Sequence, residues 1–497
     1  MYPIDSGYNR WMRSSVRVAW LVVILASACT KANPAATCAD GTCIDPAFPF
    51  CDTDGAVAGE AGTCIAVTCT PGAVSACRGD VALTCNATGD NLDELQCAHG
   101  CDPVVGCKAC DAGQTVCTNG AVAACDASGN ETRTACPLGC FQDQPRCVDI
   151  DPSNQLAMYL DMVTSPPDLH VTPPTNGAPP ATLNSTTGEV IVDGQTLTLP
   201  TFLVPAVGDA LPIRVYVVHA FTVDDKLTMS AGTANGHGPA VAILATGDIT
   251  VNAPIEAQAG ALASCAGGDG DDLGNAQDFS AASGGGGNAT PGGAGGSING
   301  TVAGGIAGSA HGTSQLEPLV GGCNAGAIIA QQGGSFAGSF GGGALQLSSR
   351  TQITIKSRVD AFGFAGYTDR GQNGNGDAFD NVASGGGGGG ALLLEAPEVV
   401  LTSGAELNAA GGAGGQFCPS PTFNCGAAGV GATSTSALAS NGMGVTIHSG
   451  DTTNDYITGG GGGGLGRVRI NTPDGNVELS SRPLIEADLS VGTLRSR

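Results

Sequence analysis

The chain has 497 residues, which is long enough for about two or three domains and a sizeable buried core. Its formal net charge of −25 at pH 7 repels phosphate backbones and anionic lipid headgroups, which argues against nucleic-acid binding and against electrostatic attachment to a membrane. Aromatic residues make up only 4% of the chain, so rings on which sugars or bases could stack are scarce.

The first predicted element is an export signal that ends in a lipid-attachment cysteine. Arg13 and Arg17 precede the apolar run Val18–Ala28, whose last residues are small, and Cys29 follows directly. A positive region, an apolar run and small residues before a cysteine are typical of the cleavage site of bacterial lipoproteins. Cys29 is also the odd member of 21 cysteines, which leaves an even number to pair. We therefore expect Cys29 to carry acyl chains.

The predicted signal peptide covers residues 1–28, and the lipid anchor and tether cover residues 29–37. Thr30 follows the anchor cysteine, which resembles the outer-membrane sorting pattern of Gram-negative lipoproteins. No second apolar run approaches the roughly 18 to 20 residues that span a bilayer. The chain is therefore expected to be exported and held at the outer membrane or cell surface, with the lipid bilayer as the partner of its acyl chains.

Residues 38–148 are predicted to be a disulfide-rich region with an internal repeat. Cys38, Cys43, Cys51 and Cys64 make a small leading module. Two longer units follow with nearly the same spacing, Cys69, Cys77, Cys85, Cys97, Cys101 and Cys107, then Cys110, Cys117, Cys125, Cys136, Cys140 and Cys147. Cysteines at this density are expected to be disulfides in an oxidising compartment, because units this small have little core.

The pairing within these units stays open at the level of sequence. Six cysteines allow fifteen connectivities, and spacing alone does not choose among them. Metal binding is the alternative, since Cys107 and Cys110 form a C-x-x-C pair. No second pair stands at zinc-finger distance, and this pair straddles the boundary between the two units, so disulfides are favoured.

Residues 149–180 are rich in proline and are predicted to be a linker. Residues 181–497 then alternate short period-two strands with glycine-rich stretches. The strands come in sets of three: Val241–Leu244, Ile249–Val251 and Ile255–Ala257; Leu345–Leu347, Ile353–Ile355 and Val359–Ala361; Leu392–Leu394, Val399–Leu401 and Leu407–Ala409; Val468–Ile470, Val477–Leu479 and Ile485–Ala487. Two earlier sets are expected around Val190–Leu199 and Ile213–Met229.

A set of three short strands has one apolar side per strand and must stack on its neighbours to bury it. The prediction is therefore a mainly β fold, a right-handed parallel β-helix with long glycine-rich insertions, preceded by the disulfide-rich repeats. Residues 181–497 resemble pectin-lyase-like and adhesin-type right-handed β-helices in architecture, without a motif that matches residue by residue. Together with Cys29 and the cysteine units, they look like a group of bacterial surface lipoproteins rich in cysteine and glycine, for which no activity is assigned.

Glycine runs directly precede several of the predicted first strands. They are Gly285–Gly287, Gly341–Gly343, Gly385–Gly390 and Gly459–Gly464. Such runs are usually flexible linkers, but glycine also permits close backbone approach. Their fixed placement favours packed, extended polyglycine. Every long insertion is then expected to leave after a third strand and to build one flank of the solenoid.

Alignment of the third strands predicts one outward column of polar residues: Glu256, Asp360, Asn408 and Glu486. Strands in neighbouring coils lie about 4.8 Å apart, so stacked carboxylates repel unless water or a cation screens them. The column is a candidate Ca²⁺ ladder or a carboxylate pair near the roughly 5 Å separation of retaining glycosidases. A solvated acidic face is the favoured interpretation.

Two loops are weaker candidates for calcium, the only cofactor that the sequence suggests. Asp269, Asp271 and Asp272 follow the first half of the calcium-binding nonapeptide, in a single copy. Asp369, Asp377 and Asp380, with Asn373 and Asn375, form a second oxygen-rich loop. Surface turns also favour Asp, Asn and Gly without any metal, and this is the favoured explanation.

The remaining cysteines are predicted to staple the insertions, Cys265 with Cys323 and Cys418 with Cys425, from proximity alone. The histidines are scattered, and the sequence contains no nucleophile elbow, phosphate-binding loop or dinucleotide fingerprint. No catalytic residue is therefore assigned.

The favoured function is a non-enzymatic, surface-exposed lipoprotein, a rigid β-solenoid on a disulfide-rich stalk for adhesion or matrix contact. Its expected partners are extracellular polysaccharide or protein, and nucleic acid is not among them. The alternative is a β-helix polysaccharide lyase or hydrolase that acts on extracellular glycans. A lyase needs a basic residue beside the acidic column, for which Arg350, Lys356 and Arg358 are the candidates. A loose or disordered glycine-rich half is a third possibility.

Overall fold

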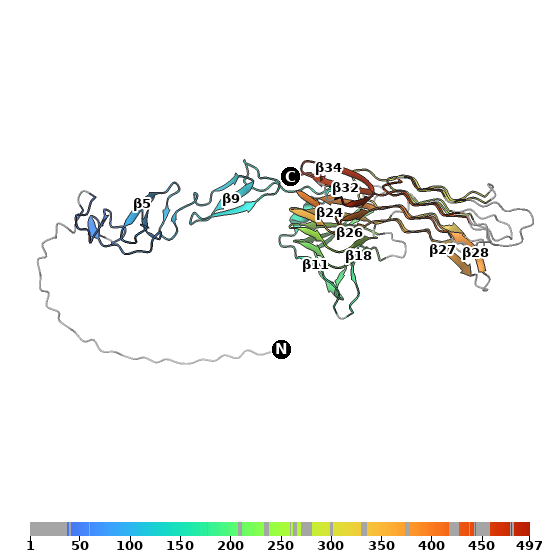
Figure 1. Ribbon diagram of the computed structural model, residues 1–497, viewed down its shortest axis with the longest axis horizontal. Helices are drawn as coiled ribbons and strands as arrows, with labels where there is room; N and C mark the ends of the chain where they lie inside the picture. The colour runs from blue at the N-terminus through green and yellow to red at the C-terminus, as the bar shows by residue number, and fades with distance from the viewer. Residues whose placement is uncertain are drawn as a thin grey trace, which may run out of the picture. The chain divides into compact units, whose positions relative to one another are not determined.

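The computed structural model describes residues 37–38, 41–58, 60–175, 177–206, 211–232, 238–258, 260–261, 266–269, 281–298, 302–329, 335–372, 378–416, 427–436, 438–441, 443, 458–477, 479 and 482–497, with side chains left out at 328–329, 335–336, 368–372 and 378–382. The chain divides into two compact units, Met1–Val116 with Ala123–Arg133 and Cys117–Val122 with Thr134–Arg497. Both are mainly β (Figure 1). Within the described residues, no helix reaches the length and hydrophobicity of a membrane span.

The cysteine-rich region consists of small antiparallel sheets stapled by disulfides. The strands are β1 (Phe50–Asp52), β2 (Thr63–Ile65), β3 (Val74–Arg78), β4 (Val81–Cys85), β5 (Leu92–Gln96), β6 (Cys101–Asp102), β7 (Gly106–Cys107), β8 (Thr115–Thr118), β9 (Ala121–Cys125) and β10 (Glu131–Ala135). In both six-cysteine units the first cysteine pairs with the third, the second with the fifth and the fourth with the sixth: Cys69–Cys85, Cys77–Cys101 and Cys97–Cys107, then Cys110–Cys125, Cys117–Cys140 and Cys136–Cys147. The leading module pairs Cys38–Cys51 and Cys43–Cys64. The predicted disulfides are confirmed, and the structure selects one connectivity.

The second unit is built on three sheets that the chain visits in turn. A seven-stranded sheet contains β15 (Thr201–Val204), β16 (Ile213–Val218), β19 (Ala240–Ala245), β24 (Ala344–Ser349), β29 (Ala391–Glu395), β32 (Arg467–Thr472) and β34 (Asp488–Thr493). A five-stranded sheet contains β11 (Leu169–Val171), β17 (Phe221–Val223), β20 (Ile249–Val251), β25 (Gln352–Ile355) and β30 (Glu398–Leu401). An eight-stranded sheet contains β14 (Gln195–Leu197), β13 (Val190–Val192), β12 (Ala181–Asn184), β18 (Leu227–Ser230), β21 (Ile255–Ala257), β26 (Arg358–Asp360), β31 (Glu406–Asn408) and β33 (Leu484–Glu486).

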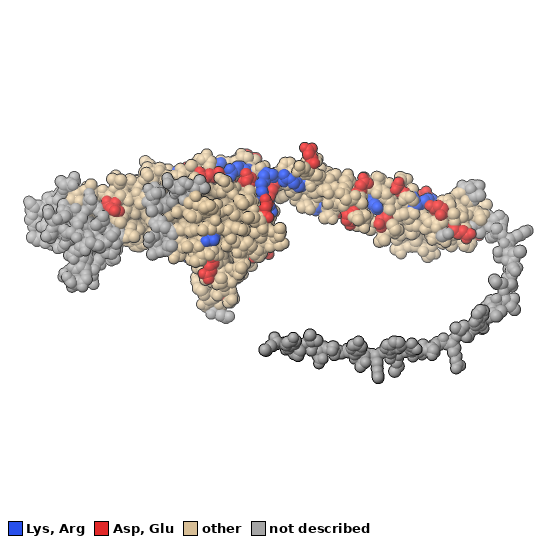
Figure 2. Space-filling model, turned by 180° about the vertical axis from the view of Figure 1, so that it is seen from behind, with Lys and Arg blue, Asp and Glu red and all other residues tan. Residues whose placement is uncertain are grey.

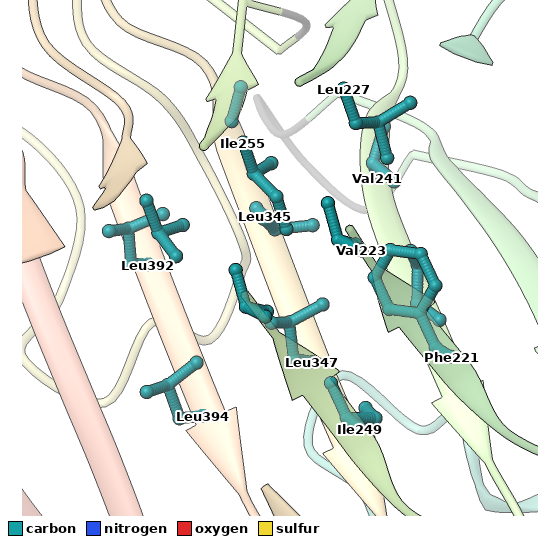
Figure 3. Packing of buried hydrophobic residues seen from close by; sticks show 14 of the residues in the cluster. Phe221, Val223, Leu227, Val241, Ile249, Ile255, Leu345, Leu347, Leu392 and Leu394 are labelled. Carbon is teal, nitrogen blue, oxygen red and sulfur yellow. The ribbon is translucent and has the colours of Figure 1, made fainter. Parts of the chain in front are cut away.

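From β16 to β31 the pairing between successive sets is parallel throughout, with one strand per set in each sheet. The inward residues of all three sheets meet in one apolar core, to which Phe221, Leu227 and Leu345 belong (Figure 3). A fully buried side chain of this kind contributes roughly 1.5 to 3 kcal/mol relative to exposure, so the stacked sets hold one another together.

The seven-stranded sheet is buried on both faces, which explains its continuous apolar strands. A strap of residues 149–163, which includes α1 (Ala157–Met162), lies on its outer face. Ile150, Leu156 and Leu160 of the strap pack there against the outward residues of β16 and β19. Every residue of β19 and β24 is consequently buried, the pattern expected when a parallel sheet is covered on both sides.

The structure differs from the predicted organisation at both ends of this unit. The predicted proline-rich linker, residues 149–180, contains α1 and β11, and β11 pairs with β17. The expected set around Val190–Leu199 is an antiparallel hairpin, β13 with β14, attached to β12. Val477 and Leu479 lie outside strands, and β34, absent from the prediction, continues the seven-stranded sheet. The other predicted strands are confirmed within a residue or two.

Candidate functional sites on the eight-stranded sheet and the polyglycine bundle

The polar column predicted on the third strands is present. Glu256 pairs with Asp360, Asp360 with Asn408, and Asn408 with Glu486 in adjacent parallel strands. Period-two alternation points these side chains away from the core, while Ala361 and Ala409 point into it. The register could be predicted because each third strand carries its apolar residues on the same side.

Asp360 differs from its neighbours because its side chain is 1% exposed. Its carboxylate lies 2.6 Å from Nε of Arg358 and accepts a hydrogen bond of 3.1 Å from the side-chain amide of Asn408. Burial raises the pKa of Asp360 to about 6, against the opposing effect of Arg358. The expected solvated position is therefore wrong for this residue. A substrate cannot reach its carboxylate without moving the surrounding groups, which does not favour the glycosidase hypothesis.

The other carboxylates of the column are each paired with a donor or a cation. Glu256 lies 2.6 Å from Nζ of Lys226. Glu486 accepts hydrogen bonds of 2.9 and 2.8 Å from the backbone N–H and the hydroxyl of Ser434. Lys226 therefore offsets the charge of Glu256, whereas Glu486 keeps its charge and is solvated by the two donors of Ser434.

The basic residues considered for a lyase separate in the structure. Arg358 lies in the column beside Asp360, whereas Arg350 donates to Asp149 of the strap at 2.8 and 2.6 Å. Lys356 follows β25 of the five-stranded sheet. Of these three residues, Arg358 is the one whose guanidinium contacts the acidic column, where it is paired with Asp360.

The two predicted calcium loops are only partly described. Asp269 accepts a 2.6 Å hydrogen bond from the backbone N–H of Ala327. Asp369 and Asp380 belong to the antiparallel hairpin of β27 (Thr368–Gln372) and β28 (Ala378–Ala383), and only their backbone is described. Asp271, Asp272 and Asp377 lie outside the described residues. Among the described residues, the group of three potential metal ligands that lie close together is Cys38, Cys43 and Cys64, whose sulfurs are all in disulfides.

Cys323 is in a disulfide, as predicted, and is fully buried. Its predicted partner Cys265 lies outside the described residues, as do Cys29, Cys418 and Cys425. The pairings proposed for the insertions therefore stay predictions.

The glycine-rich insertions pack as extended segments that lie side by side (Figure 1). We call this assembly the polyglycine bundle; it comprises residues 266–268, 281–288, 291–298, 302–310, 320–327, 337–343, 361–367, 383–390, 409–416, 427–433, 438–441 and 458–466. As predicted, insertions leave after the third strands β21, β26 and β31. Three segments lead directly back into first strands, 337–343 into β24, 383–390 into β29 and 458–466 into β32.

The run Gly459–Gly464 shows how the bundle is held together. Residues three apart bond to the same neighbouring segment, as expected for a polyproline-II-like strand with three residues per turn and no internal hydrogen bonds. Its N–H groups donate from Gly460 and Gly463 to Gly415 and Gly412, from Gly461 and Gly464 to Ser283 and Gly286, and from Gly462 to Ser440. Its carbonyls accept at Gly459 and Gly462 from Gly296 and Gly293, at Gly460 and Gly463 from Gly429 and Ala432, and at Gly461 and Gly464 from Gly386 and Gly389.

Within the glycine runs of the enclosed segments there is no room for a side chain. A Cβ built on Gly462 would lie 2.1 Å from the carbonyl oxygen of Val430, and one on Gly463 would lie 1.9 Å from that of Gly387. Collagen requires glycine at its axis for the same reason, although only at every third residue. The all-glycine runs are therefore the inner strands of the bundle, and they are buried throughout.

The outer segments have a different sequence pattern because one of their sides faces solvent. In residues 302–310 the exposed positions include Ala303, Ile306 and Ser309, whereas Gly305 and Gly308 are buried. Residues 409–416 repeat Gly-Gly-x in the same way, with Ala413 and Gln416 exposed. This three-residue period is visible in the sequence, and it was the signal that could have identified the bundle beyond the glycine runs themselves.

No known protein family, curated protein or solved structure matches this chain. Its function must therefore be argued from its own residues.

Proposed function

We propose that this chain is a non-enzymatic surface lipoprotein, exported, anchored through acylated Cys29 and used for adhesion or contact with an extracellular matrix. The observation that carries the proposal is the pairing of all cysteines from Cys38 to Cys147 in repeated disulfide modules. Disulfides at this density persist in oxidising compartments outside the cytosol. Export then agrees with the signal-like run that precedes Cys29.

We infer that the three sheets of the second unit form a right-handed parallel β-helix. From β16 to β31 the chain passes from the seven-stranded to the five-stranded to the eight-stranded sheet and back again in each set, and the sheets share one core. Crossovers between parallel strands of one sheet are right-handed in about 98% of cases. A β-helix that carries a tightly hydrogen-bonded bundle supplies a stiff support for residues that contact a partner. Such a support suits adhesion better than it suits catalysis.

Extracellular polysaccharide or protein is the partner class that fits this proposal. The surface carries many neutral and acidic side chains and few basic ones, which opposes binding to polyanions. The described residues around Asp360 favour a structural role for the acidic column, so enzymatic action on glycans is the weaker hypothesis.

The experiment that tests the proposal combines fatty-acid labelling with proteolysis of intact cells. In a Gram-negative host, the wild-type chain should incorporate an alkyne-tagged palmitate, and Cys29→Ala should abolish the label. Thr30→Asp is the matched control, because it retains the acylated cysteine and should change only membrane sorting. External protease should release peptides of the second unit from cells that express the wild-type chain.

Retention of the label in Cys29→Ala, or protection of every peptide in intact cells while lysed cells are cleaved, would contradict the proposal. Mass spectrometry of the released peptides and of the N-terminal fragment gives both readouts in one preparation.

A further inference from the structure

The outer edge of β34 in the seven-stranded sheet is open. β34 pairs in parallel with β32, which lies beside it in Figure 1, and it is the last strand of its sheet among the described residues. The N–H of Leu494, directly after β34, donates to the carbonyl of Thr472 at 2.8 Å. Successive residues face opposite edges of a strand, so Leu489, Val491 and Thr493 turn their N–H and C=O groups away from β32. No described residue bonds to these groups.

The other edge strands of the three sheets are protected against pairing with another chain. β11, β14, β15, β30 and β33 are three or four residues long, and each has a proline within three residues of one end. Short strands and prolines at sheet edges hinder edge-to-edge association. β34 has six residues and no proline within three residues of it. Of the edges of these sheets, that of β34 is therefore the one best suited to accept a further strand.

The side chains of β34 that face the core side of the sheet are apolar. Leu489 pairs with Val468 and Val491 with Ile470, and both partners belong to the apolar core. Val491 is nevertheless 38% exposed. A strand added to this edge would therefore cover apolar side chains and satisfy unpaired backbone groups at the same time.

β34 is also nearly free of charge in a strongly acidic protein. The chain carries a net charge of −25, and acidic side chains are scattered over the face of the molecule that Figure 2 shows. Two copies of the chain therefore repel each other over most of their surface. Within β34 only Asp488, its first residue, is charged. A second copy thus meets little repulsion at the edge that has unpaired backbone groups.

We propose that β34 pairs antiparallel with β34 of a second copy, which joins the two seven-stranded sheets edge to edge. A twofold axis at Ser490 places Leu489 of each copy opposite Val491 of the other. Each of these pairs exchanges both of its N–H···O bonds, and the apolar side chains meet on the core side. Asp488 of each copy faces Gly492 of the other, so carboxylates are not set against each other.

The same edge serves both copies, as an isologous interface requires. A shift of the pairing by one residue is excluded, because it would set the outward groups of one copy against groups of the other that already bond to β32. The inference does not depend on lipid attachment or on adhesion.

Sedimentation velocity of the exported chain with Cys29→Ser, which carries no acyl chains, tests the proposal. The chain should show a concentration-dependent dimer. Val491→Pro removes only an N–H that faces away from β32, which a strand edge tolerates, so circular dichroism should show an unchanged fold. The dimer dissociation constant of this variant should rise by about 10- to 100-fold, because one hydrogen bond is lost in each copy. Val491→Ile, which keeps the N–H and the branched side chain, is the matched control and should leave the dimer unchanged.

Cysteine cross-linking tests the register. Ser490→Cys should form a disulfide between two copies under mild oxidation, because the Cα atoms of such a directly opposite pair lie about 4.5 Å apart, within the range of a disulfide. Thr493→Cys on the same edge is the matched control, since its two copies lie roughly 20 Å apart in this register and should stay unlinked. Mass spectrometry of peptides identifies the bond, and this test stands even if Val491→Pro disturbs folding.

Three outcomes would overturn the proposal. They are a monomer at every concentration, a folded Val491→Pro variant that dimerises as tightly as the control, and cross-linking of Thr493→Cys as efficient as that of Ser490→Cys.

Discussion

At the scale of single residues, Asp360 illustrates how burial changes a side chain that strand alternation places on the outside. Its register is that of Glu256 and Asn408, yet its carboxylate is enclosed. Burial disfavours the charged form and raises the pKa of Asp360 to about 6, although Arg358 opposes this. The residue therefore favours the folded state more when it is protonated than when it is ionised.

The pH dependence of stability should reveal this carboxyl group. In the unfolded chain Asp360 ionises near pH 3.8, and in the folded chain near pH 6. Its contribution should accordingly fall as the pH rises from about 4 to about 6 and stay constant above that, by about 1 to 3 kcal/mol in total. Urea unfolding of wild type and Asp360→Asn between pH 4 and 7 measures the difference, which should favour the variant more at pH 7 than at pH 4. The reverse trend would show that the ion pair with Arg358 dominates.

A single methyl group should distinguish inner from outer positions of the polyglycine bundle. In Gly462→Ala the new Cβ would meet the carbonyl oxygen of Val430 at 2.1 Å, so we expect a loss of about 1 to 3 kcal/mol or more from overpacking. Alanine also restricts the unfolded chain, which alone would stabilise the protein by about 0.4 to 1 kcal/mol. Ala413→Ser, at an exposed position, should stay within about 0.5 kcal/mol of wild type. Thermal unfolding of the two variants measures both effects, and equal melting temperatures would contradict the packed arrangement of the inner strands.

At the scale of elements, a buried carboxylate fastens the strap of residues 149–163 to the seven-stranded sheet. Glu395 of β29 is 1% exposed and accepts hydrogen bonds from the backbone N–H and hydroxyl of Ser153 at 3.1 and 2.7 Å. Further donors come from Gln346 and Ser348 of β24 and Asn471 of β32. The carboxylate therefore satisfies polar groups from several strands at once, and each would cost about 1 to 3 kcal/mol if left unpaired.

Replacement of this carboxylate should loosen the strap before it unfolds the sheets. Glu395→Gln keeps the shape but replaces one acceptor by a donor that faces other donors, so we expect a loss of about 1 to 3 kcal/mol. Hydrogen exchange of the amides of α1 should then speed up selectively. Glu398→Gln, an exposed change on β30, serves as the control and should leave these amides protected. Unchanged exchange in Glu395→Gln would mean that apolar contacts of Leu156 and Leu160 hold the strap alone.

At the scale of the whole molecule, the two kinds of architecture depend on different forces. The small modules have few buried apolar residues, and each disulfide contributes very roughly 2 to 4 kcal/mol to a module of this kind. The three sheets instead share a large apolar core.

Reduction should therefore unfold the modules and spare the sheets. After treatment with dithiothreitol, hydrogen exchange should lose protection in β3, β4 and β5, while β19, β24 and β29 stay protected. Mass spectrometry of peptic peptides, with the oxidised protein as reference, resolves both regions. Simultaneous loss of protection in β24 and β4 would show that the sheets also depend on disulfides.

Sequence by itself determined those features whose signals are local. Period-two alternation located most strands, the equal spacing of Cys69–Cys107 and Cys110–Cys147 identified the repeated disulfide units, and the position of the insertions after the third strands followed from the same pattern. The column of Glu256, Asp360, Asn408 and Glu486 could be predicted because every third strand must turn its apolar residues to the core.

Only the tertiary structure decided how distant segments meet. The burial of Asp360, the five donors around Glu395, the use of β11 as a strand and the loss of a strand at Val477 all depend on neighbours that no local pattern specifies. The same is true of the polyglycine bundle, in which each inner glycine is required by the carbonyl of another segment. Strand periodicity shows which face of a strand is apolar. It does not show which distant segments meet, because hydrogen bonds and close contacts form between whichever segments the packed core brings together.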